Sequence, residues 1–142
     1  MKRIKFIINS KLENVALAGM SIKSLCSLSP MDDSQAFQME LCAVEAINNS
    51  IIHAYNKEVS NDVEIILEID EKYFRIEICD RGIPMDQKIL EKADINLLQD
   101  TFDNPEEISE SGRGLAVIKD VMDRVTYESV NGLNILTMIK YT

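Results

Sequence analysis

The chain has 142 residues, of which 46% are hydrophobic and 27% are charged, and these ordinary globular proportions exclude wholesale disorder. Its length is typical of one domain, here residues 1–142, that buries most of its apolar surface. The formal net charge of −9 argues against nucleic acid or an anionic membrane as a partner, because both require basic patches on the protein.

The hydrophobic pattern predicts the elements of the N-terminal half. Residues 4–10 are expected to form a strand, and apolar or small residues at helical spacing predict a helix over 12–26. Pro30 cannot lie inside a helix, and an acidic residue or serine just after it could cap the next helix, which should end near Asn56. The apolar side of that second helix is expected to carry Phe37, Leu41, Val44, Ile51 and Tyr55.

The C-terminal half is expected to contain four strands and one helix. The strands are predicted at 63–70, 73–80, 126–130 and 133–141. The long stretch 81–112 is rich in polar residues, and loops of this length are usually functional lids or disordered insertions. Helical spacing returns over 114–125, and Asn131-Gly132 is a favourable two-residue hairpin turn between the last two strands.

The order of these elements indicates the fold class. Two helices follow the first strand, a pair of strands comes next, and the last helix precedes the final two strands. This order predicts a two-layer α/β (α+β) sandwich, with helices on one face of a mixed, largely antiparallel sheet. The sequence contains no internal repeat and no interdomain linker.

The cysteines and the N-terminus indicate the compartment. Cys26, Cys42 and Cys79 lie far apart and form neither a CxxC pair nor a zinc-binding set, so they are expected to be reduced and mostly buried. The basic N-terminus is followed by an apolar run too short for a signal peptide, and no later run could span a bilayer. We therefore expect a cytoplasmic protein.

The stretch VEAINNSIIHAY, residues 44–55, places Glu45, Asn49 and His53 at intervals of four residues. Each is rotated by about 40° from the last around the helix axis, so they form a polar strip beside the apolar side. Such a strip can line a cleft, where Asn49 could ligate a hard cation and Glu45 could accept a proton. The alternative is a solvated helix edge with His53 bonded to the backbone, and the spacing alone favours this alternative. Asn48 falls on the predicted apolar side and has no assigned role.

The stretch CDRGIPMD follows a predicted strand. Asp80 at the strand end can accept a hydrogen bond from an amino group of a ligand, and Gly82 allows a close approach of the backbone or a positive φ. The alternative is a plain strand-to-loop turn, because aspartate and glycine dominate turns for local reasons.

The stretch SGRGLAVIKDVMDRV contains two glycines, Gly112 and Gly114, just before a predicted helix. Gly112 and Gly114 would direct the backbone N–H groups of the helix N-terminus into one loop, and Arg113 could add positive charge. This arrangement can bind phosphate. The alternative is a simple flexible helix start, which two glycines fit nearly as well.

In their order and spacing, these three stretches resemble the N box and the two glycine boxes of the GHKL ATPases, whose Bergerat fold binds ATP under a mobile lid. The resemblance is in particular to the small stand-alone anti-sigma-factor serine kinases of bacterial partner-switching systems. It includes the final GLNILTMIK and spans essentially the whole chain, with the lid at about 83–111.

The resemblance implies roles for individual residues. Glu45 would be the general base that activates the hydroxyl of a protein serine or threonine. Asn49 would hold Mg²⁺ against the phosphates of ATP, and Asp80 would bind the adenine amino group. The remaining nucleotide-binding residues implied by the boxes are His53, Gly82, Gly112, Arg113, Gly114 and Leu115.

Two residues depart from the family pattern. Pro84 replaces the second glycine of the first box and should stiffen that hinge, although some relatives also carry proline there. Glu110 stands where several of these kinases have an arginine that reaches the γ-phosphate, and an acid there would repel that phosphate. Arg113 could substitute for the missing arginine.

The resemblance implies an ATP-dependent protein serine/threonine kinase that acts as an anti-sigma factor, with ATP or ADP and Mg²⁺ as ligands. It would phosphorylate a STAS-type anti-anti-sigma protein, sequester a sigma factor or an analogous regulator, and form a homodimer. The alternative is a catalytically weak, nucleotide-bound switch that only sequesters partners. Glu110 favours this switch, whereas the pair of Glu45 and Asn49 favours the kinase. A purely structural interaction protein would leave the three boxes unexplained.

Overall fold

The computed structural model describes residues 1–95 and 110–142. Of the predicted lid, about 83–111, it therefore describes the part up to Ile95 and the backbone of the last two residues. The side chain of Glu110 lies outside the described residues. None of the helices in the described part is long and apolar enough to cross a membrane.

Five strands form one sheet in the order β1-β2-β3-β5-β4. The strands span Lys2–Asn9 (β1), Asp62–Ile69 (β2), Tyr73–Asp80 (β3), Arg124–Val130 (β4) and Leu133–Tyr141 (β5). Every neighbouring pair among these described strands is antiparallel, so the largely antiparallel sheet is confirmed and has no parallel pair. Asn131 and Gly132 turn the last hairpin, and both have the positive φ that a two-residue turn requires.

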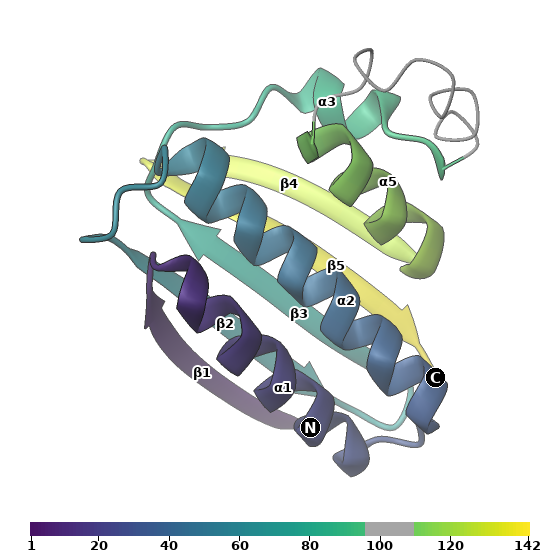
Figure 1. Ribbon diagram of the computed structural model, residues 1–142. Helices are drawn as coiled ribbons and strands as arrows, with labels where there is room; N and C mark the ends of the chain where they lie inside the picture. Colours follow the sequence, from purple (N-terminus) through teal and green to yellow (C-terminus); the bar gives the residue numbers. More distant parts are fainter. Residues whose placement is uncertain (96–109) are drawn as a thin grey trace.

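The helices lie on one face of the sheet (Figure 1), which confirms the two-layer sandwich. The α-helices that the structure describes span Val15–Leu25 (α1), Asp33–Asn49 (α2), Gln87–Lys92 (α3) and Glu110–Val121 (α5). Helix α2 crosses the middle of the sheet with α1 on one flank and α5 on the other. A short π-helical turn, Ser50–Ala54, extends α2 at its C-terminal end.

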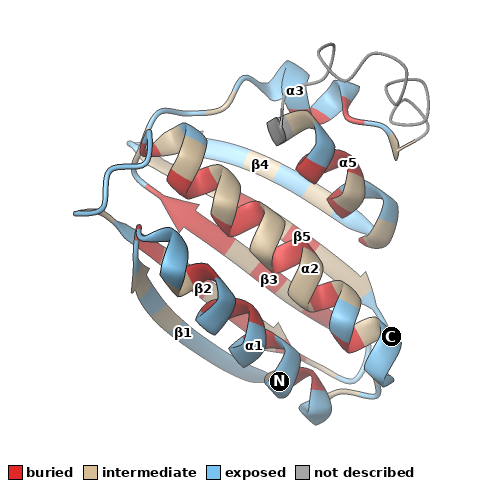
Figure 2. Ribbon diagram, in the orientation of Figure 1, coloured by how far each residue is buried: buried red, intermediate tan, exposed pale blue. Residues whose placement is uncertain are grey.

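The core lies between the sheet and the helices (Figure 2). Alternate residues of the central strands face the helices and are buried, because successive side chains of a strand point to opposite faces. These strand residues are Val63, Ile65, Leu67, Ile69, Phe74, Ile76, Ile78, Leu136 and Met138. The helices contribute Val15, Ala18, Ile22, Met39, Cys42, Ala43, Ala46, Ile47, Leu115, Ala116 and Ile118.

The inward side of α2 differs from the predicted one. Phe37, expected in the core, is 55% exposed, and Leu41 and Val44 are only half-buried. The buried residues of α2 include Ala36 and Met39 instead. The prediction was wrong because it followed the large apolar residues, whereas alanine and cysteine side chains let α2 lie close to the sheet between two other helices.

The residues beyond α2 are buried as predicted, but through a change of helical register. Ile51 is 1% exposed and Tyr55 is 7% exposed. The π turn inserts an extra residue into the helical repeat and so brings both residues onto the buried side. The sequence pattern placed Asn48 on the apolar side of the helix. Asn48 is only half-buried, whereas its neighbour Ile47 is fully buried, so Asn48 is not part of the inward side of α2.

Helix α2 begins at a capping box. The Asp32 carboxylate accepts a hydrogen bond from the Gln35 amide at 2.8 Å, and the Gln35 side chain accepts one from the Asp32 amide at 3.0 Å. Both bonds satisfy N–H groups that a helix start leaves without an internal partner. The predicted helix start after Pro30 is confirmed.

The first part of the predicted lid contains the short helix α3, which the sequence pattern did not indicate. Its cap is Asp86, whose side chain accepts the Lys88 amide at 2.9 Å. Leu90 is buried, and its carbonyl accepts a hydrogen bond from Lys119 Nζ of α5 at 2.9 Å. The burial of Leu90 and the hydrogen bonds from Lys88 and Lys119 stabilise α3. The helix was not predicted because it is too short to show a periodic pattern of apolar residues.

The three cysteines are buried free thiols, as expected. Burial raises the pKa of Cys26 and Cys79 to about 11 and that of Cys42 to about 12. Since the thiolate is the nucleophile and metal ligand, these neutral thiols act as packing side chains at neutral pH.

Candidate functional site

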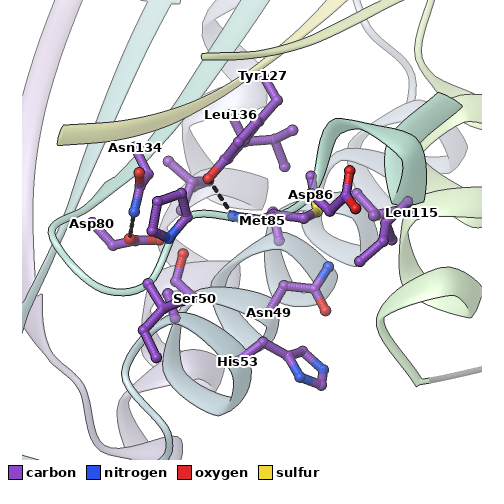
Figure 3. Close-up of a pocket in the computed structure, with 16 residues that line it drawn as sticks. Asn49, Ser50, His53, Asp80, Met85, Asp86, Leu115, Tyr127, Asn134 and Leu136 are labelled. Atoms are coloured by element: carbon purple, nitrogen blue, oxygen red, sulfur yellow. Dashed lines mark hydrogen bonds between the residues drawn. The ribbon is translucent and has the colours of Figure 1, made fainter. Parts of the chain in front are cut away.

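A cavity of about 210 Å³ lies between the end of α2, the loop that follows β3, strand β5 and α5 (Figure 3). Its apolar wall includes Ile78, Ile83, Met85, Leu115 and Leu136. Its polar groups include Asn49, Ser50, His53, Asp80, Tyr127 and Asn134. An apolar cavity with a few convergent polar groups is the usual form of a small-molecule site.

The polar stretch 44–55 forms the last turns of α2 and the π turn. In the π turn the Tyr55 amide donates to the Ser50 carbonyl, five residues earlier, at 3.0 Å. The Ala54 carbonyl accepts a bond from outside the helix, namely from the Ile83 amide of the loop after β3, at 2.9 Å. π turns are frequent at functional sites, and here the turn attaches the end of α2 to the wall of the cavity.

Gly82 allows this attachment. A Cβ at this position would lie 2.3 Å from the Ala54 carbonyl oxygen, a distance that no side chain tolerates. The sequence suggested that Gly82 permits a close approach, and the structure identifies the approaching group as the backbone of the π turn.

Asp80 lies at the bottom of the cavity and is 7% exposed. Its Oδ1 accepts the Gly82 amide at 3.1 Å and the Asn134 side-chain amide at 2.7 Å. Asn134 Nδ2 also donates to the Gly82 carbonyl at 2.9 Å. Within the described residues the second oxygen, Oδ2, makes no hydrogen bond, so Asp80 retains one acceptor for a ligand.

Two tyrosines hold the loop after β3 from either side. The Tyr55 hydroxyl accepts the Arg81 amide at 2.8 Å and donates to the Asp62 carbonyl at 2.6 Å. The Tyr127 hydroxyl accepts the Met85 amide at 2.8 Å. Burial raises the pKa of both phenols, so they remain neutral hydrogen-bonding groups at physiological pH.

Asn49 of α2 and His53 of the π turn line the cavity, which agrees with the cleft interpretation of the polar strip and not with the solvated helix edge that the spacing alone favoured. The Asn49 Nδ2 atom is buried and has no hydrogen-bond partner in the described part of the chain. A buried donor without a partner is unfavourable by about 1–3 kcal/mol, so this amide is ready to bind a ligand. The His53 side chain is exposed at the rim.

Glu45 lies one turn before Asn49 and is half-buried, but it does not line the cavity. It contacts α5 instead, because a Cβ on Gly114 would lie 2.7 Å from Glu45 Oε2. Burial raises the pKa of the Glu45 carboxyl above its ordinary value. A carboxylate with a raised pKa is a stronger base near neutral pH.

The second glycine stretch differs from the expectation. Helix α5 begins at Glu110, so Gly112 and Gly114 lie in its first turns and not in a loop before it. Among the described side chains of this stretch, Leu115 lines the cavity, whereas Gly112, Arg113 and Gly114 do not. The physical reason is the contact between α5 and Glu45, since the missing side chain at Gly114 lets the helix itself pass close to α2.

Sequence reasoning missed Asn134 and Tyr127, and it placed Tyr55 on the inward side without its hydrogen bonds to the loop. One signal was available: Asn134 occupies an inward position of its strand, where the alternation of LNILTMIKY otherwise places Leu136 and Met138. A polar residue at a buried strand position needs hydrogen-bond partners, which marks it for attention.

Comparison with known proteins agrees with this geometry. Residues 8–140 match the family described as Histidine kinase-like ATPase domain. The chain belongs to this family. Membership of this family implies that the chain binds ATP.

Relatives of this ATPase domain include two curated bacterial proteins. An anti-sigma F factor from Clostridium beijerinckii is 30% identical over 138 residues, which cover 96% of this chain and 90% of that protein. The serine-protein kinase RsbW from Oceanobacillus iheyensis is 31% identical over 143 residues, covering 97% of this chain and 85% of that protein. These matches confirm the resemblance drawn from the three sequence stretches.

The fold is also similar to that of a chain in the crystal structure of the SiaB-SiaC complex from Pseudomonas aeruginosa. The TM-score is 0.61, and the alignment covers 98% of this chain and 89% of that one. At 11% sequence identity this likeness establishes the shared fold alone.

The contact between Gly82 and the π turn yields the first prediction. We expect Gly82→Ala to lower the free energy of unfolding by about 1–3 kcal/mol, because the added methyl group forces the loop away from the Ala54 carbonyl. Urea denaturation measures the change, with Arg81→Ala as the control, since Arg81 is exposed and its backbone amide is retained. Equal stability of Gly82→Ala and the wild type would show that the close approach is absent.

Proposed function

We propose that this ATPase domain is an ATP-dependent protein serine/threonine kinase that acts as an anti-sigma factor in a partner-switching system. The observation that carries the proposal is the position of Asp80, which has one oxygen held by the protein and one available at the bottom of an apolar cavity. Membership of the ATPase family and the similarity to an anti-sigma F factor and a serine-protein kinase support it.

The cavity would hold the adenine base. The exocyclic amino group would donate to Asp80 Oδ2, and Ile78, Met85 and Leu136 would pack against the base. A volume of about 210 Å³ is smaller than the roughly 300–1,000 Å³ of sites that enclose a whole ligand. The ribose and phosphates would therefore extend out of the cavity, along α2 past Asn49.

The phosphates would lie between α2 and the start of α5. A helix N-terminus favours negative charge, and Arg113 lies in the first turn of α5. Asn49 could hold Mg²⁺ through its side-chain oxygen, because amide oxygens ligate hard cations. Its buried Nδ2, which has no partner in the described part of the chain, would instead donate to an acceptor such as a phosphate oxygen. No group of three or more acidic, histidine or cysteine side chains in the described residues could bind a metal, so the phosphates and water would supply the other ligands. Bound Mg²⁺ would neutralise charge that develops on the transferred phosphoryl group.

Glu45 would act as the general base. Its raised pKa suits proton transfer near neutral pH, and it lies one helical turn from Asn49. It would accept the proton of a serine hydroxyl while the serine oxygen attacks the γ-phosphorus. The bond from the γ-phosphorus to the bridging oxygen would break, and ADP would leave.

The substrate would be a serine of a STAS-type anti-anti-sigma protein. Phosphorylation would release that protein and leave this chain, as a homodimer in the cytoplasm, able to sequester a sigma factor or an analogous regulator.

A second candidate function is a nucleotide-bound switch that sequesters partners without useful catalysis. The observation that favours the switch is Glu110, an acid where several of the kinases that the chain resembles have an arginine that reaches the γ-phosphate.

Phosphoryl transfer from labelled ATP to a STAS-domain partner tests the kinase directly. We expect the wild type to label a serine, and Glu45→Gln to lower the rate by about 10²–10⁴-fold because the general base is lost. The affinity of Glu45→Gln for Mg-ADP should stay close to that of the wild type, since Glu45 does not line the cavity. Glu40→Gln, on the same helix but away from the cavity, is the control.

Transfer by Glu45→Gln at the wild-type rate would exclude Glu45 as the base. Tight nucleotide binding by the wild type without any transfer would favour the switch. If the wild type binds neither Mg-ATP nor Mg-ADP, both functions are wrong.

The burial of Glu45 also predicts a dependence of stability on pH. Because folding raises the pKa of this carboxyl, its contribution to stability is fully present below the unfolded-state pKa and is lost as pH rises through the folded-state pKa. At neutral pH the ionised carboxylate is therefore unfavourable in the folded state. Glu45→Gln should be at least as stable as the wild type at neutral pH, and this advantage should vanish in acid. Urea denaturation over a pH series measures the difference, and a variant that is markedly less stable at neutral pH would contradict this account.

A further inference from the structure

Lys119, in the last turn of α5, reaches α3 with its side chain. Its Nζ donates to the Leu90 carbonyl at 2.9 Å and to the Glu91 carbonyl at 3.4 Å. The Leu90 carbonyl also accepts the Ala93 amide, at 3.3 Å. Leu90 and Glu91 belong to the last turn of α3, where a helix leaves carbonyls without an internal partner. A lysine at this end satisfies those carbonyls and interacts favourably with the helix dipole.

Helix α3 depends on contacts of this kind. It has six residues, and a helix so short is not stable in water by itself. Leu90 is its one buried residue, and the other five are exposed. The helix lies beside α5 (Figure 1), which carries Lys119. The two hydrogen bonds from Lys119 are therefore a large part of what holds α3 in place.

The position of α3 affects the shape of the cavity. Ile89 of α3 lines the cavity, and so do Met85 and Asp86 just before the helix. The beginning of this segment is fixed, because the Tyr127 hydroxyl accepts the Met85 amide at 2.8 Å. Without the bonds from Lys119 at its other end, α3 would be free to pivot about that point and take Ile89 out of the cavity wall.

We propose that Lys119 is a positioning residue for the nucleotide: it ties the C-terminal end of α3 to α5, keeps Met85 and Ile89 in the cavity wall before the ligand binds, and so sets how tightly the nucleotide is held. This inference rests on the proposed function, because it takes the ligand of the cavity to be a nucleotide.

Lys119 acts on binding and not on the transfer step. It follows Glu110, the first residue of α5, by nine positions, which correspond to about 14 Å along the helix axis. The phosphates would lie at the start of α5, so Lys119 is too far away to contact them. Removal of its donors should weaken nucleotide binding and leave the rate at saturating ATP unchanged.

Isothermal titration with Mg-ADP tests the inference on Lys119→Met, which keeps most of the side-chain length but removes the donors. We expect the Kd to rise by about 3- to 10-fold, because the apparent affinity falls with the fraction of molecules in which the site is formed. Lys119→Arg keeps a donor and should stay within about twofold of the wild type. Lys92→Met is the control, because it removes a positive charge from the same end of α3 and Lys92 makes no hydrogen bond within the described residues.

Two further measurements separate positioning from a general loss of stability. In the kinase assay, Lys119→Met should raise the KM for ATP by the same factor as the Kd, while kcat stays within about twofold of the wild type. In the nucleotide-free protein, the Ile89 and Ala93 amides donate to the carbonyls of Asp86 and Leu90. Both amides should exchange their hydrogens faster in Lys119→Met than in Lys92→Met.

The outcomes distinguish this inference from the proposed function. If Lys119→Met is less stable in urea but binds Mg-ADP like the wild type, Lys119 has only a structural role and the inference is wrong. It is also wrong if Lys92→Met weakens binding as much, since charge alone would then explain the effect. Wild-type binding without transfer would reject the kinase alone, and the affinities would still decide this inference. If the wild type binds neither Mg-ADP nor Mg-ATP, the proposed function and this inference fail together.

Discussion

The candidate site depends on the contact between the end of α2 and the loop that follows β3. The Ala54 carbonyl accepts the Ile83 amide, and Gly82 lies so close to that carbonyl that any side chain would prevent the contact. The π turn makes the contact possible because it ends α2 with a carbonyl directed at the loop and not along the helix. Once the loop is held here, Asp80 is fixed at the bottom of a cavity whose walls come from both layers of the sandwich.

Helix α2 links the two ends of the proposed ligand. Its last turns hold the loop that would surround the base. Asn49 lines the cavity one turn earlier, and Glu45 lies one turn before that, against α5. Residues four apart on a helix are separated by about 6 Å along its axis. The spacing along one rigid element would therefore set the distance from base recognition to phosphoryl transfer, while the sheet supplies Asp80 and Asn134 from the opposite side.

Local sequence patterns predicted much of this arrangement, and tertiary packing decided the rest. The alternation of the strands and the helix start after Pro30 depend on neighbours in sequence, and the structure agrees with them. Of the polar strip of Glu45, Asn49 and His53, the last two line the cavity and Glu45 does not. The inward side of α2 and the start of α5 depend on how closely three helices pack, which periodicity does not report. The bond between Asp80 and Asn134 joins residues 54 positions apart through the strand register, so no local pattern could indicate it.

Hydrogen bonds within the protein hold the loop beside Asp80, at the end of the cavity where we propose that the base binds. Hydrogen exchange of the nucleotide-free protein measures this most directly, because the amides of Arg81, Gly82, Ile83 and Met85 each have a partner within the protein. The account predicts that all four amides are protected without nucleotide and that ADP changes their protection little. Exchange at the rate of an unfolded chain, with protection appearing only after ADP is added, would contradict it.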